Sequence, residues 1–157
     1  MKENKRISAS VLLKHDEAFE QKEVTIDIEG EKYTVKIDQK FRISKIQSMI
    51  LEGLNNYKNY SKLDESVRML YFVYLIMKYF TDMDLRQAKT FKHEVRLMNS
   101  LLDLNIIEQV FEHIPEGEIL KVREYMDKVE KAIEKIKKQG KSVPELKNII
   151  SKEVVEK

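Results

Sequence analysis

The sequence predicts a mainly α-helical α+β fold, in which an N-terminal β-hairpin is followed by a bundle of about six helices. Two observations support this fold class. Only residues 24–37 alternate apolar and polar side chains, as a half-buried strand does, and beyond residue 38 apolar side chains recur every three or four positions. Glycine and proline are also scarce, at four and two among 157 residues, which argues against a loop-rich fold.

The hairpin signal is "VTIDIEGEKYTVKI", residues 24–37. Apolar residues alternate with polar ones on both sides of Gly30: Val24, Ile26 and Ile28 precede it, and Tyr33, Val35 and Ile37 follow it. A four-residue loop pairs Ile28 with Tyr33, and a two-residue loop pairs Ile26 with Tyr33; both registers leave one apolar face. Because an isolated hairpin is marginally stable in water, we expect this face to lie on helices or on a partner's sheet.

The helical part is expected to form a single globular domain with the hairpin over residues 24–140. Helices are predicted at about 45–57, 62–80, 84–104, 106–113 and 118–138. Their expected starts are a capping box of Ser44 and Gln47, a cap at Ser61, and the stretch "TDMD" at 81–84.

The two ends of the chain are treated separately. Residues 1–23 form a charged leader, which is either frayed or a short helix capped by Ser8 or Ser10 and docked through Val11, Leu12 and Phe19. Residues 141–157 are expected to form a C-terminal helix that either packs back or projects.

The most apolar stretch runs from Met69 to Met77, nine residues without a charge between Arg68 and Lys78. A membrane-spanning helix needs about 20 apolar residues, so we expect no membrane association. Extended to Phe80, the stretch is apolar almost all round, which is typical of a central helix inside a core. No apolar segment of signal-peptide length follows the charged start, and the absence of cysteine suits a reducing compartment, so a cytoplasmic location is expected.

Catalytic, cofactor and metal sites are not indicated. His15, His93 and His113 are isolated, and the four glycines stand alone, which excludes a phosphate-cradling loop. Asp82 and Asp84 resemble a magnesium pair, but acidic residues before a helix are better explained as caps. The sequence therefore predicts a protein that is not an enzyme and binds no cofactor.

A basic stretch occupies residues 36–62, with six basic and two acidic side chains. Phe41, Tyr57 and Tyr60 lie within it, and basic residues mixed with aromatic ones are typical of single-strand binding. The favoured interpretation is a solvated face. The alternative is a nucleic-acid-binding phage regulator that acts through Lys40, Arg42 and Lys45.

The predicted helix 118–138 carries a regular apolar stripe, which we call the seam. Its members recur at alternating spacings of three and four: Ile119, Val122, Met126, Val129, Ile133 and Ile136. The stripe is narrow because its flanking positions include Arg123, Glu130 and Lys137, as in a coiled coil. Such a seam requires a partner helix, which is the C-terminal helix, a second copy, or another protein.

The order of elements resembles the tail assembly chaperones of long-tailed phages that infect Gram-positive hosts. The matching stretches, over residues 8–138, are "ASVLLKHD", "VTIDIEGEKYTVKI", "FRISKIQSMI", "LYFVYLIMKYF" and "MNSLLDLNIIEQVFEHIPEGEI", followed by a charged helical segment. The resemblance implies a non-enzymatic protein of the infected cell's cytoplasm that binds the tape-measure protein or other tail proteins. The seam and the open edge of the hairpin are the expected docking surfaces. Inhibition of a host protein is a further alternative.

Overall fold

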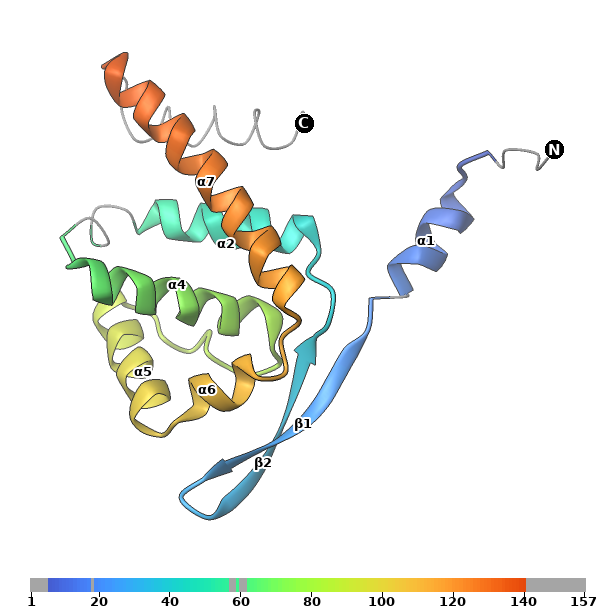
Figure 1. Ribbon diagram of the computed structural model, residues 1–157, viewed down its shortest axis with the longest axis vertical. Helices are drawn as coiled ribbons and strands as arrows, with labels where there is room; N and C mark the ends of the chain where they lie inside the picture. The colour runs from blue at the N-terminus through green and yellow to red at the C-terminus, as the bar shows by residue number, and fades with distance from the viewer. Residues whose placement is uncertain (1–5, 18, 57–58, 60–61, 141–157) are drawn as a thin grey trace.

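The computed structural model describes residues 6–17, 19–56, 59 and 62–140 (Figure 1). Its elements are α1 (Ala9–Glu17), β1 (Gln21–Ile28), β2 (Glu31–Asp38), α2 (Ile43–Asn55), α4 (Glu65–Phe80), α5 (Phe91–Asp103), α6 (Ile106–Phe111) and α7 (Glu116–Lys138). This architecture confirms the predicted fold class. The helices from α2 to α7 gather against the hairpin, whereas α1 stands apart from them (Figure 1). Residues 141–157, for which a last helix is predicted, lie outside the described residues.

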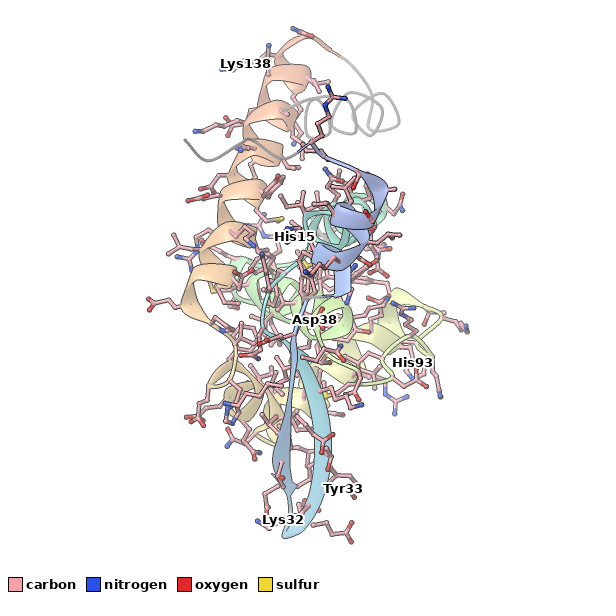
Figure 2. The ribbon with its side chains drawn as sticks, turned by 90° about the vertical axis from the view of Figure 1, so that its right-hand side faces the viewer. His15, Lys32, Tyr33, Asp38, His93 and Lys138 are labelled. Atoms are coloured by element: carbon pink, nitrogen blue, oxygen red, sulfur yellow. The ribbon has the colours of Figure 1, made fainter. Side chains whose placement is uncertain are left out.

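The hairpin adopts the register of the two-residue loop. Val24 lies opposite Val35, and Ile26 lies opposite Tyr33. The loop residues Glu29 and Gly30 both have positive φ, at 53° and 90°. Positive φ at both central positions defines a type I′ turn, whose twist matches that of the two strands it connects. The tip of the hairpin, with Lys32 and Tyr33, extends beyond the helices (Figure 2).

The apolar face of the hairpin packs on the helices, as the sequence predicts, with Val24, Ile26, Val35 and Ile37 buried. Its edges, however, are partly occupied. Asp82 N donates to Lys36 O at 3.0 Å, and Lys36 N donates to Asp82 Oδ1 at 2.7 Å along β2. On β1, Asp27 N donates to Gln109 Oε1 at 2.9 Å, and Gln109 Nε2 donates to Asp27 O at 2.8 Å. The expectation of an open edge is therefore wrong at these positions.

Helix α4 packs into the core, which confirms that the apolar run is a core element, but it is not surrounded on all sides, since Met69 is 68% exposed. Tyr71, Tyr74, Ile76 and Met77 are fully buried, and so is Phe80. The Phe80 ring stacks on that of Phe41, with centroids 3.7 Å apart. Among the described residues, none of the helices has the length and apolar character needed to cross a membrane.

The helix predicted for residues 84–104 begins only at Phe91, so its predicted start is wrong. Thr81 bridges Ile37 of β2, and the chain stays irregular up to Thr90. Thr90 then caps α5, because its Oγ1 accepts from His93 N at 3.1 Å. Asp82 binds the β2 backbone, and Asp84 accepts from Gln87 Nε2 at 2.7 Å, so neither aspartate acts as the expected cap.

Other predicted helix starts also shift. Helix α2 begins at Ile43, so Ser44 lies in its first turn, and no side chain caps its N-terminus. Asp64 caps α4 by accepting from Val67 N at 3.1 Å, whereas Ser61 lies outside the described residues. The leader does form a helix, α1, but Val11 and Leu12 are exposed rather than docked. Phe19, beyond the end of α1, is half-buried, and Lys40 and Arg42 lie over its ring.

Candidate functional site

A cleft of about 310 Å³ lies between α7 and the pair α2 and α4. We refer to it as the α7 cleft. Its lining residues are Met49, Ile50, Gly53 and Leu54 of α2, Arg68, Tyr71, Phe72 and Leu75 of α4, and Met126, Val129, Glu130, Ile133, Glu134 and Lys137 of α7. The charged members Arg68, Glu130, Glu134 and Lys137 are at least partly exposed, whereas most of the apolar members are buried. The cleft thus has an apolar floor and charged residues at its margin.

The seam of α7 is divided between the core and this cleft. Val122, Val129 and Ile136, which are spaced by seven residues, are buried against the rest of the chain. The other three members, Ile119, Met126 and Ile133, are half-buried, and Met126 and Ile133 line the cleft. Helix α7 therefore buries one row of its stripe, whereas Met126 and Ile133 of the second row stay partly exposed and line the cleft beside the buried Val129.

The α2 side of the cleft is shaped by Gly53. A Cβ atom at this position would lie 3.6 Å from Leu75 Cδ1, which is an ordinary van der Waals contact. The absence of a side chain at Gly53 leaves the cleft open beside Leu75. The volume of the α7 cleft is at the lower end of the range for ligand pockets. A short apolar groove of this kind suits a few side chains from one helix.

Behind the cleft floor lies a buried polar cluster formed by α2, α4 and α5. Tyr71 lines the cleft, and its hydroxyl accepts from Asn56 Nδ2 at 2.8 Å. Lys78 forms an ion pair with Glu52, and its Nζ lies 4.0 Å from Glu94 Oε1. Glu52 Oε2 and Glu94 Oε2 are buried and have no hydrogen-bond partner among the described residues.

Burial changes the acid–base properties of this cluster. It raises the pKa of Glu94 above its usual value, while Lys78 acts in the opposite direction. Burial also raises the pKa of Tyr79 to about 12, with a further contribution from Glu52. The pKa values of Tyr71 and Tyr74 are raised for the same reason. The cluster is therefore an environment that disfavours negative charge.

Sequence analysis missed this cluster, although two signals were present. Lys78 interrupts an otherwise apolar helix, and Glu94 falls on the apolar stripe of α5 between Phe91 and Met98. A charged residue at a core position requires a buried partner. The sequence does not say which helix supplies that partner. Among the described residues, no group of three or more histidine, aspartate or glutamate side chains is placed to hold a metal ion.

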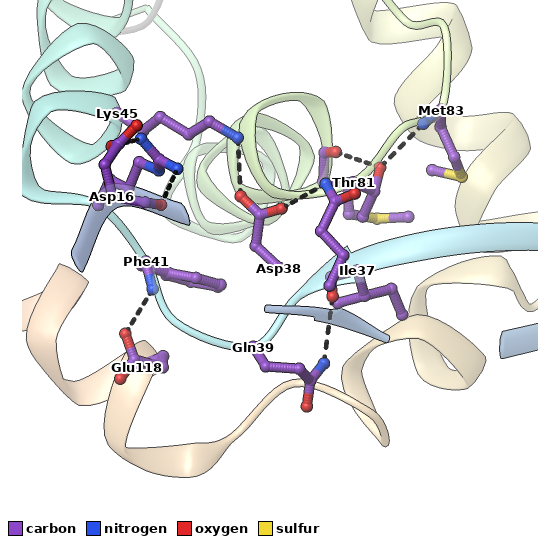
Figure 3. A network of polar contacts seen from close by, with 12 residues as sticks. Asp16, Ile37, Asp38, Gln39, Phe41, Lys45, Thr81, Met83 and Glu118 are labelled. Atoms are coloured by element: carbon purple, nitrogen blue, oxygen red, sulfur yellow. Dashed lines mark hydrogen bonds and ion pairs between the residues drawn. The ribbon is translucent and has the colours of Figure 1, made fainter. Parts of the chain in front are cut away.

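The residues proposed for nucleic-acid binding do come together, beside the N-terminus of α2. The Arg42 guanidinium lies 4.4 Å from the centre of the Phe19 ring, and Lys40 Nζ lies 5.1 Å from it. Arg42 also pairs with Asp16, and Lys45 Nζ lies 2.7 Å from Oδ2 of the buried Asp38 (Figure 3).

These ion pairs bear on the nucleic-acid alternative. Asp38 also accepts from Gln21 Nε2 at 2.8 Å, so its carboxylate is held in place. The carboxylates of Asp16 and Asp38 offset the positive charge that Arg42 and Lys45 would offer to phosphates.

His15 and His93, on α1 and α5, lie far apart (Figure 2).

Comparison with known proteins gives one family. The YomO family matches residues 10–157. The chain belongs to the YomO family. The YomO match covers every described element that lines the α7 cleft. Membership indicates a phage-associated protein, in agreement with the phage part of the resemblance. No curated protein and no solved structure matches the chain.

Proposed function

We propose that this YomO-family protein is a non-enzymatic binding protein of phage assembly, and that the α7 cleft receives an apolar helix of another phage protein. The proposal rests on the seam of α7, because two of its apolar side chains remain partly exposed. Met126 and Ile133 face the cleft with part of their surface uncovered, although they continue the stripe by which α7 packs on its own chain. Covering that surface with an apolar helix removes it from water, at about 25 cal/mol per Å².

Charged side chains at the margin of the cleft would determine how the partner helix is oriented in it. Arg68 lies at the start of α4, and Glu130 and Glu134 lie one turn apart on α7. Charges at the rim of an interface contribute mainly to the rate of association and to the register of the partner. The helix that fits the cleft best therefore has an apolar stripe, flanked by charges opposite in sign to those of Arg68, Glu130 and Glu134.

The more specific proposal is a role in tail morphogenesis, as a tail assembly chaperone or accessory protein. The resemblance in element order implies a tape-measure protein, which is long and helical, as the partner. In this role the cleft covers an apolar segment of the tape-measure protein before the tail is built, and so keeps that segment from aggregating. The activity consists of binding alone.

The test is co-expression with the tape-measure protein of the same phage, followed by affinity purification. We compare the wild type with Ile133→Glu, which places a carboxylate in the cleft, and with Leu120→Glu as a matched control on the same helix. Leu120 is exposed and does not line the cleft. Circular dichroism confirms that each variant is folded.

We expect the wild type and Leu120→Glu to retain the partner, and Ile133→Glu to weaken binding by about tenfold or more, since an unpaired charge enters an apolar site. Met126→Glu is a second cleft variant with the same expected result. Equal retention by the cleft variants and the wild type, or an absence of any complex with the wild type, would overturn the proposal.

A further inference from the structure

Helix α7 ends beside the α7 cleft. Lys137 lines the cleft, and Lys138 is the last residue of the helix. Gly140 has a φ of 71°, and its N–H donates to Lys137 O at 3.2 Å. A glycine in the left-handed conformation just after the C-cap ends a helix and allows the chain to change direction. The described part of the chain therefore stops at a turn next to the cleft.

The residues that follow this turn carry an apolar stripe in their sequence. They are residues 141–157, which lie outside the described residues. Pro144 fits the first turn of a helix in this segment. Residues 139–143 then form a connection of the short length that joins antiparallel helices. The apolar residues stand at positions i, i+3 and i+4, which share one face of a helix: Leu146, Ile149 and Ile150.

We propose that residues 141–157 return along α7 as a helix and place Leu146, Ile149 and Ile150 in the α7 cleft of the same chain. We call this segment the cover. This inference rests on the proposed function, because it assigns an internal competitor to the same helix-binding cleft. The cover also gives Met126 and Ile133 the neighbouring helix that the spacing of the seam requires.

The positions of the two apolar surfaces along α7 agree. With the α-helical rise of about 1.5 Å per residue, Ile133 lies about 10 Å before Gly140. On the same scale Ile150 lies about 9 Å beyond Pro144, so a helix that returns from the turn brings its apolar face to the level of Ile133. The cleft volume of about 310 Å³ corresponds to about ten water molecules at roughly 30 Å³ each. This is room for a few aliphatic side chains from one helix.

Connection along the chain, and not charge, favours this occupant. The charged side chains that line the cleft have no net charge: Arg68, Lys137, Glu130 and Glu134. A segment that is joined to the cleft by a few residues is present there at an effective concentration on the order of millimolar. A separate protein equals the cover only when it binds more tightly or is present at a similar concentration. The cover therefore has the advantage over any separate helix of similar affinity.

The cover makes partner binding conditional. A helix of the tape-measure protein enters the cleft only by displacing the cover, so the two exclude each other. The affinity for the partner is then the intrinsic affinity reduced by the fraction of molecules whose cleft is open. Before a partner is present, the cover keeps Met126 and Ile133 from contact with water and with other apolar segments.

The first experiment is disulfide trapping in the full chain, which contains no cysteine of its own. Each variant carries one cysteine on α7 and one in the cover, and it is treated with oxidised glutathione at low protein concentration. Circular dichroism confirms that each variant is folded. Ile133→Cys is combined in turn with Leu146→Cys, Ile149→Cys and Ile150→Cys.

The matched control has Lys131→Cys in place of Ile133→Cys, with the same three positions of the cover. Lys131 is exposed, does not line the cleft, and lies at nearly the same distance along α7 from Gly140. Residues two positions apart point to different sides of a helix. The control therefore measures how often the cover meets the other side of α7.

We expect at least one pair with Ile133→Cys to form a disulfide within one chain, about tenfold or more faster than the same pair with Lys131→Cys, because the cover holds the two thiols together. Electrophoresis without reductant separates this product from a disulfide between two chains, which doubles the mass. Equal rates at the two positions of α7, disulfides between chains only, or no disulfide with Ile133→Cys would each overturn the inference.

The second experiment measures the affinity for the tape-measure protein. Leu146→Glu combined with Ile150→Glu disrupts the cover and leaves every described residue unchanged. Asn148→Glu combined with Ser151→Glu adds the same charge on the other side of the expected helix and is the control. We expect the first variant to bind about threefold or more tightly than wild type, and the control to bind as wild type does. An unchanged or lower affinity of the first variant would contradict competition between cover and partner.

The outcomes separate this inference from the proposed function. If Ile133→Cys forms no disulfide with the cover, yet the wild type retains the tape-measure protein through Ile133, the cover is wrong and the proposed function stands. If the disulfide forms within one chain while no tail protein is retained, the cover stands and the proposed function is wrong. Disulfide trapping needs no partner, so its result does not depend on which protein the cleft binds.

Discussion

Lys78 Nζ lies 4.0 Å from Glu94 Oε1 in the interior of the domain, and it also forms an ion pair with Glu52. One ammonium group thus lies near two carboxylates, the half-buried Glu52 of α2 and the buried Glu94 of α5. A buried ion pair is stabilising only when its geometry offsets the loss of water. Here Glu94 is 7% exposed, and one oxygen of each carboxylate has no hydrogen-bond partner among the described residues. This arrangement makes the stability of the fold sensitive to the ionisation of Glu94.

Glu94→Gln is expected to stabilise the protein at neutral pH. The pKa of Glu94 in the fold is raised above 4.5, its ordinary value, mainly by burial. The fold therefore favours the protonated acid: this contribution to stability is full below the ordinary pKa and is lost as pH rises through the raised pKa. Glutamine is neutral at every pH, so its advantage over wild type should grow from about pH 4.5 upward.

Urea denaturation between about pH 4.5 and pH 8 measures this difference, as a shift of the midpoint urea concentration with an unchanged slope of free energy against urea. The control is Glu124→Gln, an exposed residue of α7, for which the difference from wild type should stay small. A Glu94→Gln variant that is less stable than wild type at neutral pH would show that the ionised pair with Lys78 is favourable.

Asp82→Ala is expected to lower the free energy of unfolding by about 1 kcal/mol, the usual contribution of a hydrogen bond. Asp82 Oδ1 accepts from Lys36 N at 2.7 Å and so closes the outer edge of β2. Asp84→Ala is the control, since the Asp84 carboxylate accepts from the exposed Gln87 side chain and not, among the described residues, from the backbone of β2. Equal effects of the two substitutions in thermal denaturation would contradict the role assigned to Asp82.

Gly53→Ala is expected to raise stability by about 0.5–1 kcal/mol, because glycine inside a helix is less favourable than alanine by that amount. The new Cβ meets Leu75 Cδ1 at 3.6 Å, which requires no rearrangement. Gly117→Ala in α7, where a Cβ meets nothing within 4 Å, is the matched control for helix propensity.

The two glycine variants should differ in binding. Gly53 lines the α7 cleft and Gly117 does not, so only Gly53→Ala narrows the cleft. In the retention assay with the tape-measure protein, Gly53→Ala should bind more weakly than Gly117→Ala, even though both are at least as stable as wild type. A destabilised Gly53→Ala variant would show that the floor beside Leu75 is closer packed than the structure indicates.

Glu29→Asn is expected to stabilise the hairpin by a few tenths of a kcal/mol to about 1 kcal/mol, since asparagine accepts positive φ more readily than glutamate does. Glu29 has a φ of 53°, beside Gly30 at 90°. Glu23→Asn, at an exposed position inside β1, changes the same residue type without the turn and should not stabilise. The midpoint of thermal denaturation distinguishes the two, and a gain at both positions would rule out the turn as the cause.

The hairpin shows how far the sequence pattern reaches. The alternation of residues 24–37 predicts the apolar face that the structure shows, but it is satisfied by a two-residue and by a four-residue loop. The choice between them depends on the backbone of Glu29 and Gly30, which both take positive φ. Periodicity in side-chain type carries no information about that backbone state.

The segment between α4 and α5 shows where local pattern fails. Leu85 and Ala88 have helical spacing relative to Phe91, and both are buried, but they lie outside a helix. Thr81 and Asp82 pair with β2, about 45 residues earlier in the chain. A long-range backbone pairing of this kind overrides local propensity, and nothing within the segment itself announces it.

The sequence alone determined the fold class, the contribution of the apolar run to the core from Tyr71 onward, and the apolar stripe of α7, because each is a pattern within one segment. Only the tertiary structure decided that one row of that stripe is buried while Met126 and Ile133 line a cleft, and that Lys78 meets Glu52 and Glu94. Those contacts join residues on different helices, so they depend on how the helices pack against one another. Helix packing is set by the shapes of whole surfaces, and the spacing of residues along the chain does not specify it.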